Sequence, residues 1–358
     1  MGLARGMHAS RSLRRRSAVA GTVCLLLAGA VACGPAEAAG PPAERVRTAL
    51  DRTTAQESAT VVADLDAPVG EVRALLSELG RDAGREQARR LAATEVAMAL
   101  EADRPLNELE TYGPGTRLVV GLCLGDRDVV SYKSVDGRVY LRLLPKELLD
   151  HGALTPAQHD RVEEIVGLAD ELPGSLEATR RLLTGGWVSL KPEAFQDYGW
   201  ALEELTGRTV HREQSRGAAG LLDGEELRTA LTGLENLLGR HTAYRVVGED
   251  DGVERLRAEL PARRTAKVLA PLLQPLGTGF DPAEVAEGRV PATVIIRRGS
   301  LAEARLDLGS LIGDGSVRVP LRLRFSPGDI YSPKAPRNAV ELEPQDLLAA
   351  ALFGARRS

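Results

Sequence analysis

Short segments of alternating apolar and polar residues, joined in pairs by tight turns, constrain the fold of this chain most strongly. Three pairs flank turn sequences that suit a hairpin, namely Asp136-Gly137, Asp251-Gly252 and Arg298-Gly299-Ser300. Two-residue hairpin turns need positive φ, which Gly adopts readily, and Asp-Gly is a strong hairpin signature. Because hairpins join antiparallel strands, the sequence predicts an antiparallel sheet with one apolar face and one polar face.

The expected strands form two groups, one before and one after a helical middle. The segments with strand character are 59–65, 94–101, 117–124, 129–134, 138–143, 187–190, 244–247, 253–260, 292–297, 301–308 and 317–325. In the last segment, apolar residues alternate with Arg318, Pro320, Arg322 and Arg324. Pro320 has no N–H to donate to a neighbouring strand, so we expect this strand at a sheet edge or with a bulge.

Apolar residues at helical spacing separate the two groups of strands. Thr155-Pro156-Ala157-Gln158 is typical of a helix start and precedes an apolar stripe over 162–172. Two further stripes are Phe195/Tyr198/Leu202/Leu205 and Leu227/Leu231/Leu234/Leu238, and shorter helices are expected near 69–79, 176–183, 263–273 and 342–352. Hairpins combined with long helical blocks indicate an α+β fold, with one sheet and helices gathered on one of its faces. We expect a single domain over 46–358.

The first 32 residues have the pattern of an export signal. Arg5, Arg11 and Arg14–Arg16 precede an apolar run of 14 residues, 18–31. A helix needs about 20 apolar residues to cross a bilayer, so this run fits the core of a signal peptide. Residues 33–45 are rich in Pro, Gly and Ala and are typical of a flexible tether.

The end of this segment, Ala30-Val31-Ala32-Cys33, resembles the lipobox of bacterial lipoproteins. The resemblance implies that the Cys33 sulfur receives a diacylglyceryl group and that Cys33 becomes the mature N-terminus. Ala30 departs from the usual Leu. The expected location is the extracytoplasmic face of the cell membrane, reached through the N-terminal lipid. Two alternatives stay open: cleavage after Ala30–Ala32 or Ala36–Ala38 would give a secreted protein, and the arginine triplet leaves twin-arginine export open.

Three features together resemble the LppX/LprAFG-type lipoproteins of actinobacteria. They are the lipobox, the hairpin segment Ser131–Arg142 and the segment Gly186–Leu190. The resemblance implies a large curved antiparallel sheet, a half-barrel, with helices packed on one face and an apolar cavity for lipid acyl chains between them. It implies a protein that binds or shuttles a lipid or other apolar ligand, and it identifies no ligand-contact residue. The alternative is a non-catalytic scaffold or interaction lipoprotein with a filled core.

Composition excludes several other classes of protein. A net charge of −4 argues against a nucleic-acid binder, which is usually basic on one face. An aromatic content of 3% argues against a platform that stacks sugars or bases. Once Cys24 leaves with the signal and Cys33 is acylated, Cys123 is the remaining thiol, so no intrachain disulfide is expected and Cys123 should be buried.

No catalytic motif, metal-ligand set or cofactor motif is recognisable in the sequence, so we expect no enzyme. Several charged groups still deserve a structural test. Glu163/Glu164 and Glu203/Glu204 are typical of solvated helix surfaces and would need a cleft to act as general acids. The row Arg318/Arg322/Arg324 either binds anionic headgroups or is an exposed sheet face with interspersed acids. The remaining groups are His151, His159, His211, His241 and Glu249-Asp250-Asp251.

Overall fold

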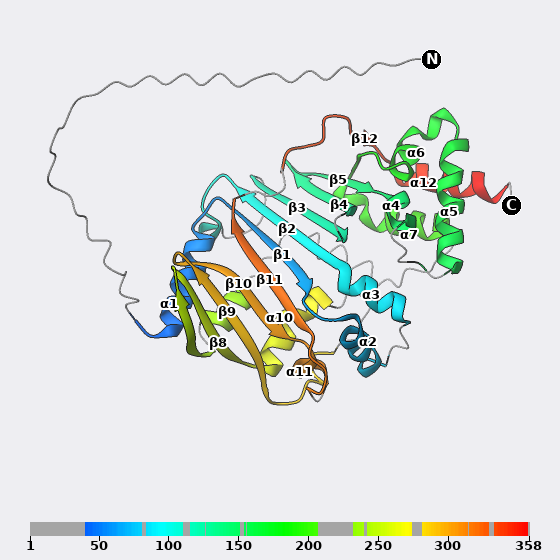
Figure 1. The fold of residues 1–358 in the computed structure, drawn as a ribbon. Coiled ribbons are helices and arrows are strands. Elements are labelled where there is room, and N and C mark those ends of the chain that lie inside the picture. The colour runs from blue at the N-terminus through cyan, green and yellow to red at the C-terminus, as the bar shows by residue number, and fades with distance from the viewer. Residues whose placement is uncertain are drawn as a thin grey trace, which may run out of the picture. The chain divides into compact units, whose positions relative to one another are not determined.

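The structure is a computed structural model. A 12-stranded sheet forms its centre (Figure 1). The strand order is β12-β6-β5-β4-β3-β2-β1-β11-β10-β9-β8-β7, and the sheet is open because the edge strands β12 and β7 do not pair with each other. The structure describes residues 40–80, 84–109, 115–125, 127–150, 154, 156–206, 232–239, 242–273, 281–313, 315–328 and 333–356.

The strands agree closely with the segments expected from the alternation of apolar and polar residues. They are β1 (Ser58–Leu65), β2 (Thr94–Ala102), β3 (Thr116–Leu124), β4 (Arg127–Val135), β5 (Arg138–Leu143), β6 (Val188–Leu190), β7 (Ala243–Asp250), β8 (Val253–Pro261), β9 (Arg289–Arg297), β10 (Ser300–Asp307), β11 (Pro320–Pro327) and β12 (Val340–Glu341). Neighbouring strands pair antiparallel, except β12 and β6, which pair parallel. The predicted antiparallel sheet is confirmed, with one parallel edge pair that the sequence did not predict.

The three predicted hairpin turns have the backbone that their sequences require. In the turn between β4 and β5, φ is 53° at Asp136 and 73° at Gly137. The turns between β7 and β8 and between β9 and β10 repeat this conformation, with positive φ at both central residues. Two consecutive residues with positive φ give the twist that a tight antiparallel hairpin needs. The pairing of neighbouring strands is therefore fixed locally at three places in the sheet.

The helices are α1 (Pro42–Thr54), α2 (Val69–Glu78), α3 (Arg85–Ala93), α4 (Pro145–Asp150), α5 (Pro156–Glu171), α6 (Glu177–Leu183), α7 (Phe195–Thr206), α10 (Ala262–Leu273), α11 (Gly309–Ile312) and α12 (Pro344–Ala355). Residues 232–239 are also helical. Helices α1 and α3 were not predicted, and α1 begins within the stretch expected to be a tether. Among the described residues, no helix has the length and apolar character that crossing a membrane requires.

The pairing register divides the sheet into two faces, because residues directly opposite each other point to the same side. The apolar face carries side chains such as Leu100, Leu118, Val294, Leu306 and Leu323. Helices cover it in two clusters. The first cluster packs α1, α2, α10, α11 and 232–239 against β8 to β11, and the second packs α5, α6, α7 and α12 against β2 to β6. The predicted arrangement of helices on one sheet face is confirmed.

The opposite face, called the polar face below, is partly covered by the connection from β11 to β12. Thr60 Oγ1 on β1 donates to Gly328 O at 2.9 Å, and Lys133 Nζ on β4 donates to Lys334 O at 3.3 Å. Thr60 and Lys133 lie in one row of residues paired across four strands, with Ala99 and Val119 between them. These small and apolar residues are buried although they face away from the helices.

The prediction that the strand around Pro320 lies at a sheet edge or carries a bulge is wrong, because the pairing of β11 shows no register shift. β11 lies between β1 and β10 in the interior of the sheet. Pro320 is its first residue, where it lies opposite Asp307 and accepts a hydrogen bond from the Asp66 N–H at 2.9 Å. A proline at the first position of a strand does not interrupt the hydrogen bonds that follow it, which resolves the apparent conflict with an interior position.

We expect Leu306→Ala to lower the free energy of unfolding by about 2–5 kcal/mol, because it leaves a cavity in the first cluster. Leu306 is 1% exposed on the apolar face of β10. Leu352→Ala is the matched control, since Leu352 is 64% exposed and its truncation should change stability by about 0.5 kcal/mol or less. Urea denaturation followed by circular dichroism measures both. Equal effects of the two substitutions would contradict the assignment of the core.

Candidate functional site

Several residues singled out from the sequence lie outside the described residues. They are Cys33 and the rest of the expected signal and lipobox, together with His151, His211, His241, Leu227 and Leu231. Cys123 is described, and its predicted burial is confirmed. It lies on β3, where its Sγ donates to Asp128 Oδ1 at 3.2 Å, so it is held within the sheet.

A cleft of about 570 Å³ opens between α5, α7 and α12, on the outer side of the second cluster. The residues around it are Arg161, Glu164, Ile165, Gly167, Leu168, Glu171, Glu204, Ala351, Gly354 and Ala355. The resemblance implied a cavity between the helices and the sheet, whereas this cleft lies among the helices. Its volume falls in the range of known small-molecule sites.

The walls of the cleft come from distant parts of the chain and are held by specific contacts. Helix α12 passes close to α5, since a Cβ at Gly354 would lie 3.3 Å from Leu168 Cδ2. Helix α7 is tied to the segment that leads into α12, because the Tyr198 hydroxyl donates to Leu342 O, two residues before that helix begins. Burial raises the pKa of Tyr198, which keeps that hydroxyl protonated. These contacts hold the three helices at a fixed spacing.

The first turn of α12 is fixed by a capping box and an ion-pair cluster. Glu343 accepts a hydrogen bond from the backbone N–H of Asp346, and the Asp346 carboxylate accepts one from the Glu343 N–H. Lys191 Nζ contacts Glu343 and lies 3.0 Å from Glu341 Oε1. Hydrogen bonds to these two carboxylates raise the pKa of Lys191. The helix that forms one wall of the cleft is thus anchored where it begins.

The cleft combines aliphatic walls with an acidic rim. Ile165, Leu168 and Ala351 supply apolar surface, while Glu164, Glu171 and Glu204 supply carboxylates. Arg161 is the one cation among the lining residues, and it pairs with Glu164. A rim with more carboxylates than cations disfavours an anionic ligand. The arrangement therefore suits an apolar ligand whose polar end is uncharged or cationic.

Two large exposed apolar side chains occur on the helices that form the cleft. Trp200 on α7 is 57% exposed and lies one helical turn before Glu204. Leu352 on α12 is 64% exposed and lies one turn before Ala355. Residues three or four apart share a helix side. Trp200 therefore shares a helix side with Glu204, and Leu352 with Ala355, although neither is among the residues that line the cleft.

The sequence pointed to Glu163/Glu164 and Glu203/Glu204 as solvated pairs, and the structure separates their members. Glu164 and Glu204 line the cleft, although they are far apart in the chain. Glu163 instead lies with His159 and Asp160, whose possible ligand atoms are all within 4.8 Å of one another. Those three residues belong to one turn of α5, and such groups are common on helix surfaces that hold no metal.

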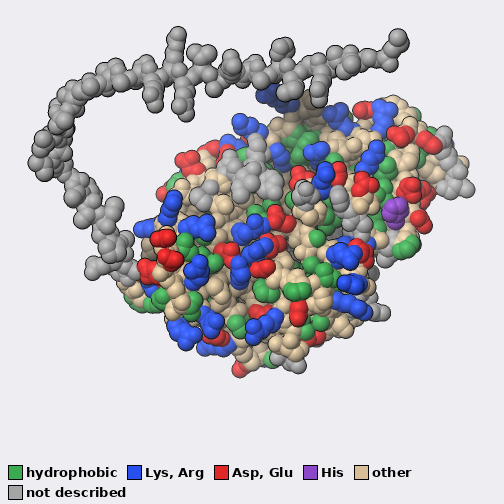
Figure 2. All heavy atoms as spheres, viewed as in Figure 1, with side chains coloured by type: hydrophobic (Ala, Val, Ile, Leu, Met, Phe, Trp, Pro, Cys, Tyr) green, Lys and Arg blue, Asp and Glu red, His purple; other side chains and the backbone are tan. Residues whose placement is uncertain are grey.

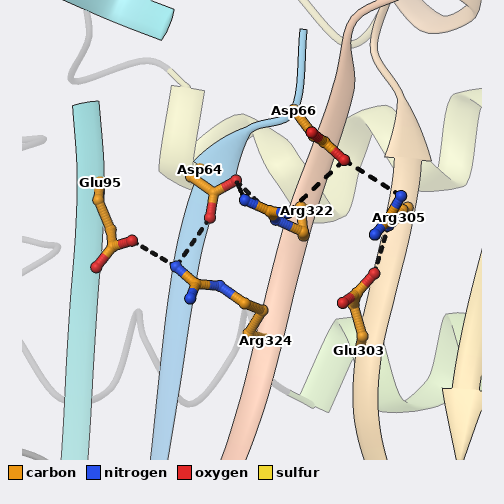
Figure 3. A network of polar contacts seen from close by, with 7 residues as sticks. All are labelled: Asp64, Asp66, Glu95, Glu303, Arg305, Arg322 and Arg324. Carbon is orange, nitrogen blue, oxygen red and sulfur yellow. Dashed lines mark hydrogen bonds and ion pairs between the residues drawn. The ribbon is translucent and has the colours of Figure 1, made fainter. Parts of the chain in front are cut away.

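The predicted arginine row belongs to a network of ion pairs on the polar face (Figure 3). Asp64 on β1 is central: its Oδ1 lies 2.9 Å from Arg322 Nη2, and its Oδ2 lies 3.0 Å from Arg324 Nη2. Arg324 also contacts Glu95 on β2, which lies directly opposite Asp64. One guanidinium thus bridges two carboxylates that would otherwise repel each other.

The network continues to β10 and is close to neutral as a whole. Arg305 contacts Glu303, and its Nη1 lies 3.2 Å from Asp66 Oδ2. Asp64, Asp66, Glu95 and Glu303 face three cations, Arg305, Arg322 and Arg324 (Figure 3). Arg318 is exposed and precedes β11. The row is therefore a sheet face with interspersed acids, one of the two predicted alternatives, and its cations are already neutralised.

Comparisons with known proteins give a likeness in fold. No protein-family model and no curated protein matches this chain. Among solved structures, the chain is similar to lipoprotein LppX of Mycobacterium tuberculosis, with 14% identity and a TM-score of 0.34 over 79% of this chain and 92% of that one. It is also similar to LprF of Mycobacterium bovis, with 12% identity and a TM-score of 0.36 over 82% of this chain and 97% of that one. Both belong to the group that the sequence resembles. At these identities and TM-scores, neither says what this chain binds.

Asp64→Asn should lower the free energy of unfolding by about 2 kcal/mol, because it weakens charge-assisted hydrogen bonds to two guanidinium groups. The Asp64 side chain is only 10% exposed. Asp66→Asn is the control on the same face: its side chain is 38% exposed, so the loss should be about 1 kcal/mol or less. Chemical denaturation at neutral pH compares the two. A larger loss for Asp66→Asn would contradict the central place of Asp64.

Proposed function

We propose that this chain is an extracytoplasmic lipoprotein, anchored to the membrane through Cys33, that binds a lipid or other apolar ligand. The observation that carries the ligand proposal is the cleft of about 570 Å³ among α5, α7 and α12. Its aliphatic surface, with the exposed Trp200 and Leu352 on the same helices, offers an acyl chain more contact than a fully packed surface would.

The acidic rim indicates the kind of ligand. Placing an anionic headgroup next to Glu171 and Glu204 would be unfavourable, because like charges repel. An acylglycerol or another chain with an uncharged polar end avoids this penalty, and its hydroxyl groups can donate to the carboxylates. The proposal is therefore a neutral acyl ligand, bound without a chemical step.

The proposed anchor depends on the N-terminal sequence. Two acyl chains on the Cys33 sulfur would hold the protein stably at a membrane, whereas a single chain gives only marginal binding. The folded unit begins at Gly40, a few residues after Cys33, so the anchor and the fold are joined by a short connection. The alternative of a secreted protein remains an outcome of the anchoring experiment.

A non-catalytic scaffold lipoprotein is the second candidate, and the packing of the two clusters favours it. Leu260, Leu269 and Val290 in the first cluster and Val188 and Leu342 in the second are at most 1% exposed. Where such side chains meet, the space between helices and sheet is occupied by the protein itself. Under this alternative the cleft would be a surface groove that binds no lipid.

Cys33→Ala should release the protein from the membrane fraction of cells into the soluble extracytoplasmic fraction, because the acylated sulfur is removed. Fractionation followed by immunoblotting, with metabolic labelling by a palmitate analogue, measures both retention and acylation. Cys123→Ala is the control, because this buried thiol should leave retention unchanged. Undiminished membrane retention and labelling of Cys33→Ala would contradict the anchor.

Gly167→Leu should reduce uptake of a monoacylglycerol at least about tenfold by filling the cleft with a side chain, since about 1.4 kcal/mol of lost contact corresponds to tenfold. A Cβ at Gly167 meets nothing within 4 Å, and replacing a helical glycine favours folding. Gly70→Leu on α2 is the matched control, because a Cβ there also meets nothing within 4 Å.

Native mass spectrometry of the mature chain measures the bound ligand in this comparison. Uptake by the wild-type chain and by Gly70→Leu, with loss in Gly167→Leu, supports the cleft as the ligand site. Absence of uptake by the wild-type chain contradicts ligand binding and favours the scaffold. Equal uptake by all three chains places the ligand elsewhere and contradicts the cleft.

A further inference from the structure

The polar face of the sheet changes its charge between β10 and the β7 edge. Across β1, β2, β10 and β11, the arginines shown in Figure 3 contact carboxylates. Across β7 to β9, the register places five exposed arginines on the same face, called the arginine patch below: Arg245, Arg255, Arg257, Arg289 and Arg297. The acids on this face of these three strands are Asp250 and Glu259, so the patch has an excess of positive charge.

The arginine patch places like charges side by side. Arg245 on β7 lies directly opposite Arg257 on β8, and Arg255 follows on the same face two residues away. Within the described part of the chain, none of these three forms an ion pair with a carboxylate. Like charges directly opposite each other destabilise a sheet. An anionic partner would remove this repulsion, whereas the network around Asp64 already has its partners within the chain.

The patch lies on the half of the sheet from which the proposed tether leaves. Helix α1 begins at Pro42 and contacts β7, β9 and β10 on the apolar face. Arg45 Nη2 on α1 lies 2.8 Å from Glu254 Oε1 on β8, and the next residue, Arg255, belongs to the patch. The start of α1 and Arg255 of the patch thus lie on opposite faces of the same strand, β8. The connection from Cys33 to Pro42 spans at most about 30 Å when fully extended, which is long enough to pass around the edge strand β7.

We propose that the arginine patch docks against the anionic surface of the membrane in which Cys33 is anchored. This inference rests on the anchor of the proposed function. A guanidinium presents planar donors that match phosphate oxygens, and each arginine near an anionic leaflet contributes about 1 kcal/mol. Figure 2 shows Lys and Arg side chains gathered over β8 and β9. Such a surface suits the many phosphates of a leaflet better than a single bound anion.

The test uses the mature chain from residue 33 carrying Cys33→Ala, so that no acyl chain masks the contribution of the patch. Co-sedimentation compares vesicles that contain phosphatidylglycerol with vesicles of phosphatidylcholine alone. We expect binding to the anionic vesicles only, weakened by salt because exposed charges are screened. Adding Arg245→Glu, Arg255→Glu and Arg257→Glu should lower the vesicle partition coefficient at least about 100-fold, since three contributions of about 1 kcal/mol are removed.

A second triple variant separates the patch from net charge. Arg73→Glu, Arg104→Glu and Arg337→Glu reverse three exposed arginines outside the patch and should leave most of the binding intact. Circular dichroism confirms that both triple variants fold. Equal loss in the two triples would overturn the proposal, as would unchanged binding of the patch triple or equal binding to both kinds of vesicle.

The experiments separate membrane docking from binding of a soluble polyanion, and they separate it from the proposed anchor and ligand site. Binding to a soluble polyphosphate with no binding to anionic vesicles would assign the patch to a soluble polyanion and overturn membrane docking. The anchor is tested by fractionation of Cys33→Ala and the cleft by uptake in Gly167→Leu, and neither measurement uses the arginine patch. Failure of the vesicle experiment would therefore leave the anchor and the ligand site standing.

Discussion

The antiparallel pairing register is the constraint on which the rest of this structure depends. Side chains alternate between the two faces of a strand, so a shift by one residue would move every apolar side chain to the other face. Three hairpin turns with positive φ fix this register locally, and helices pack on the resulting apolar face in two clusters. The charges of the opposite face are arranged by the same pairing, which places Arg322 directly opposite Asp64 and Arg257 directly opposite Arg245.

The two ends of the 12-stranded sheet carry different helices and different proposed sites. One end carries α5, α6, α7 and α12 with the cleft, beside the edge formed by β6 and β12. The other carries α1, the start of the folded unit and the arginine patch, beside the edge strand β7. Figure 1 shows α1 and α5 at opposite ends of the sheet. The central strands β1 and β11 join these ends through the ion pairs of Asp64. The central network thus links two regions whose proposed partners differ in charge.

Local patterns allowed much of the fold to be predicted, and contacts between distant segments account for the rest. Alternation and turn sequences predicted the strands other than β12 and the α+β fold class, since each depends on neighbouring residues. The burial of Cys123 was predicted instead because it is the thiol that remains once Cys24 is removed and Cys33 is acylated. The parallel pair of β6 and β12 and the interior position of β11 depend on how distant segments meet. The sequence did not predict helix α1, because Pro and Ala near its start are also typical of a flexible tether. Pro is nevertheless favoured in a first helical turn.

The cleft could not be predicted from the sequence, because it too depends on contacts between distant segments. Glu164 and Glu204 look alike as members of solvated acidic pairs, and only the packing of α5, α7 and α12 shows that they share a rim. With Cys33 in a bilayer and the arginine patch on its surface, the polar face of β7 to β9 would lie against the membrane. The cleft lies at the other end of the sheet, beside the edge formed by β6 and β12. An acidic rim at that distance would also avoid repulsion from the anionic leaflet, so the separation of the two charged surfaces and the proposed location of the protein support each other.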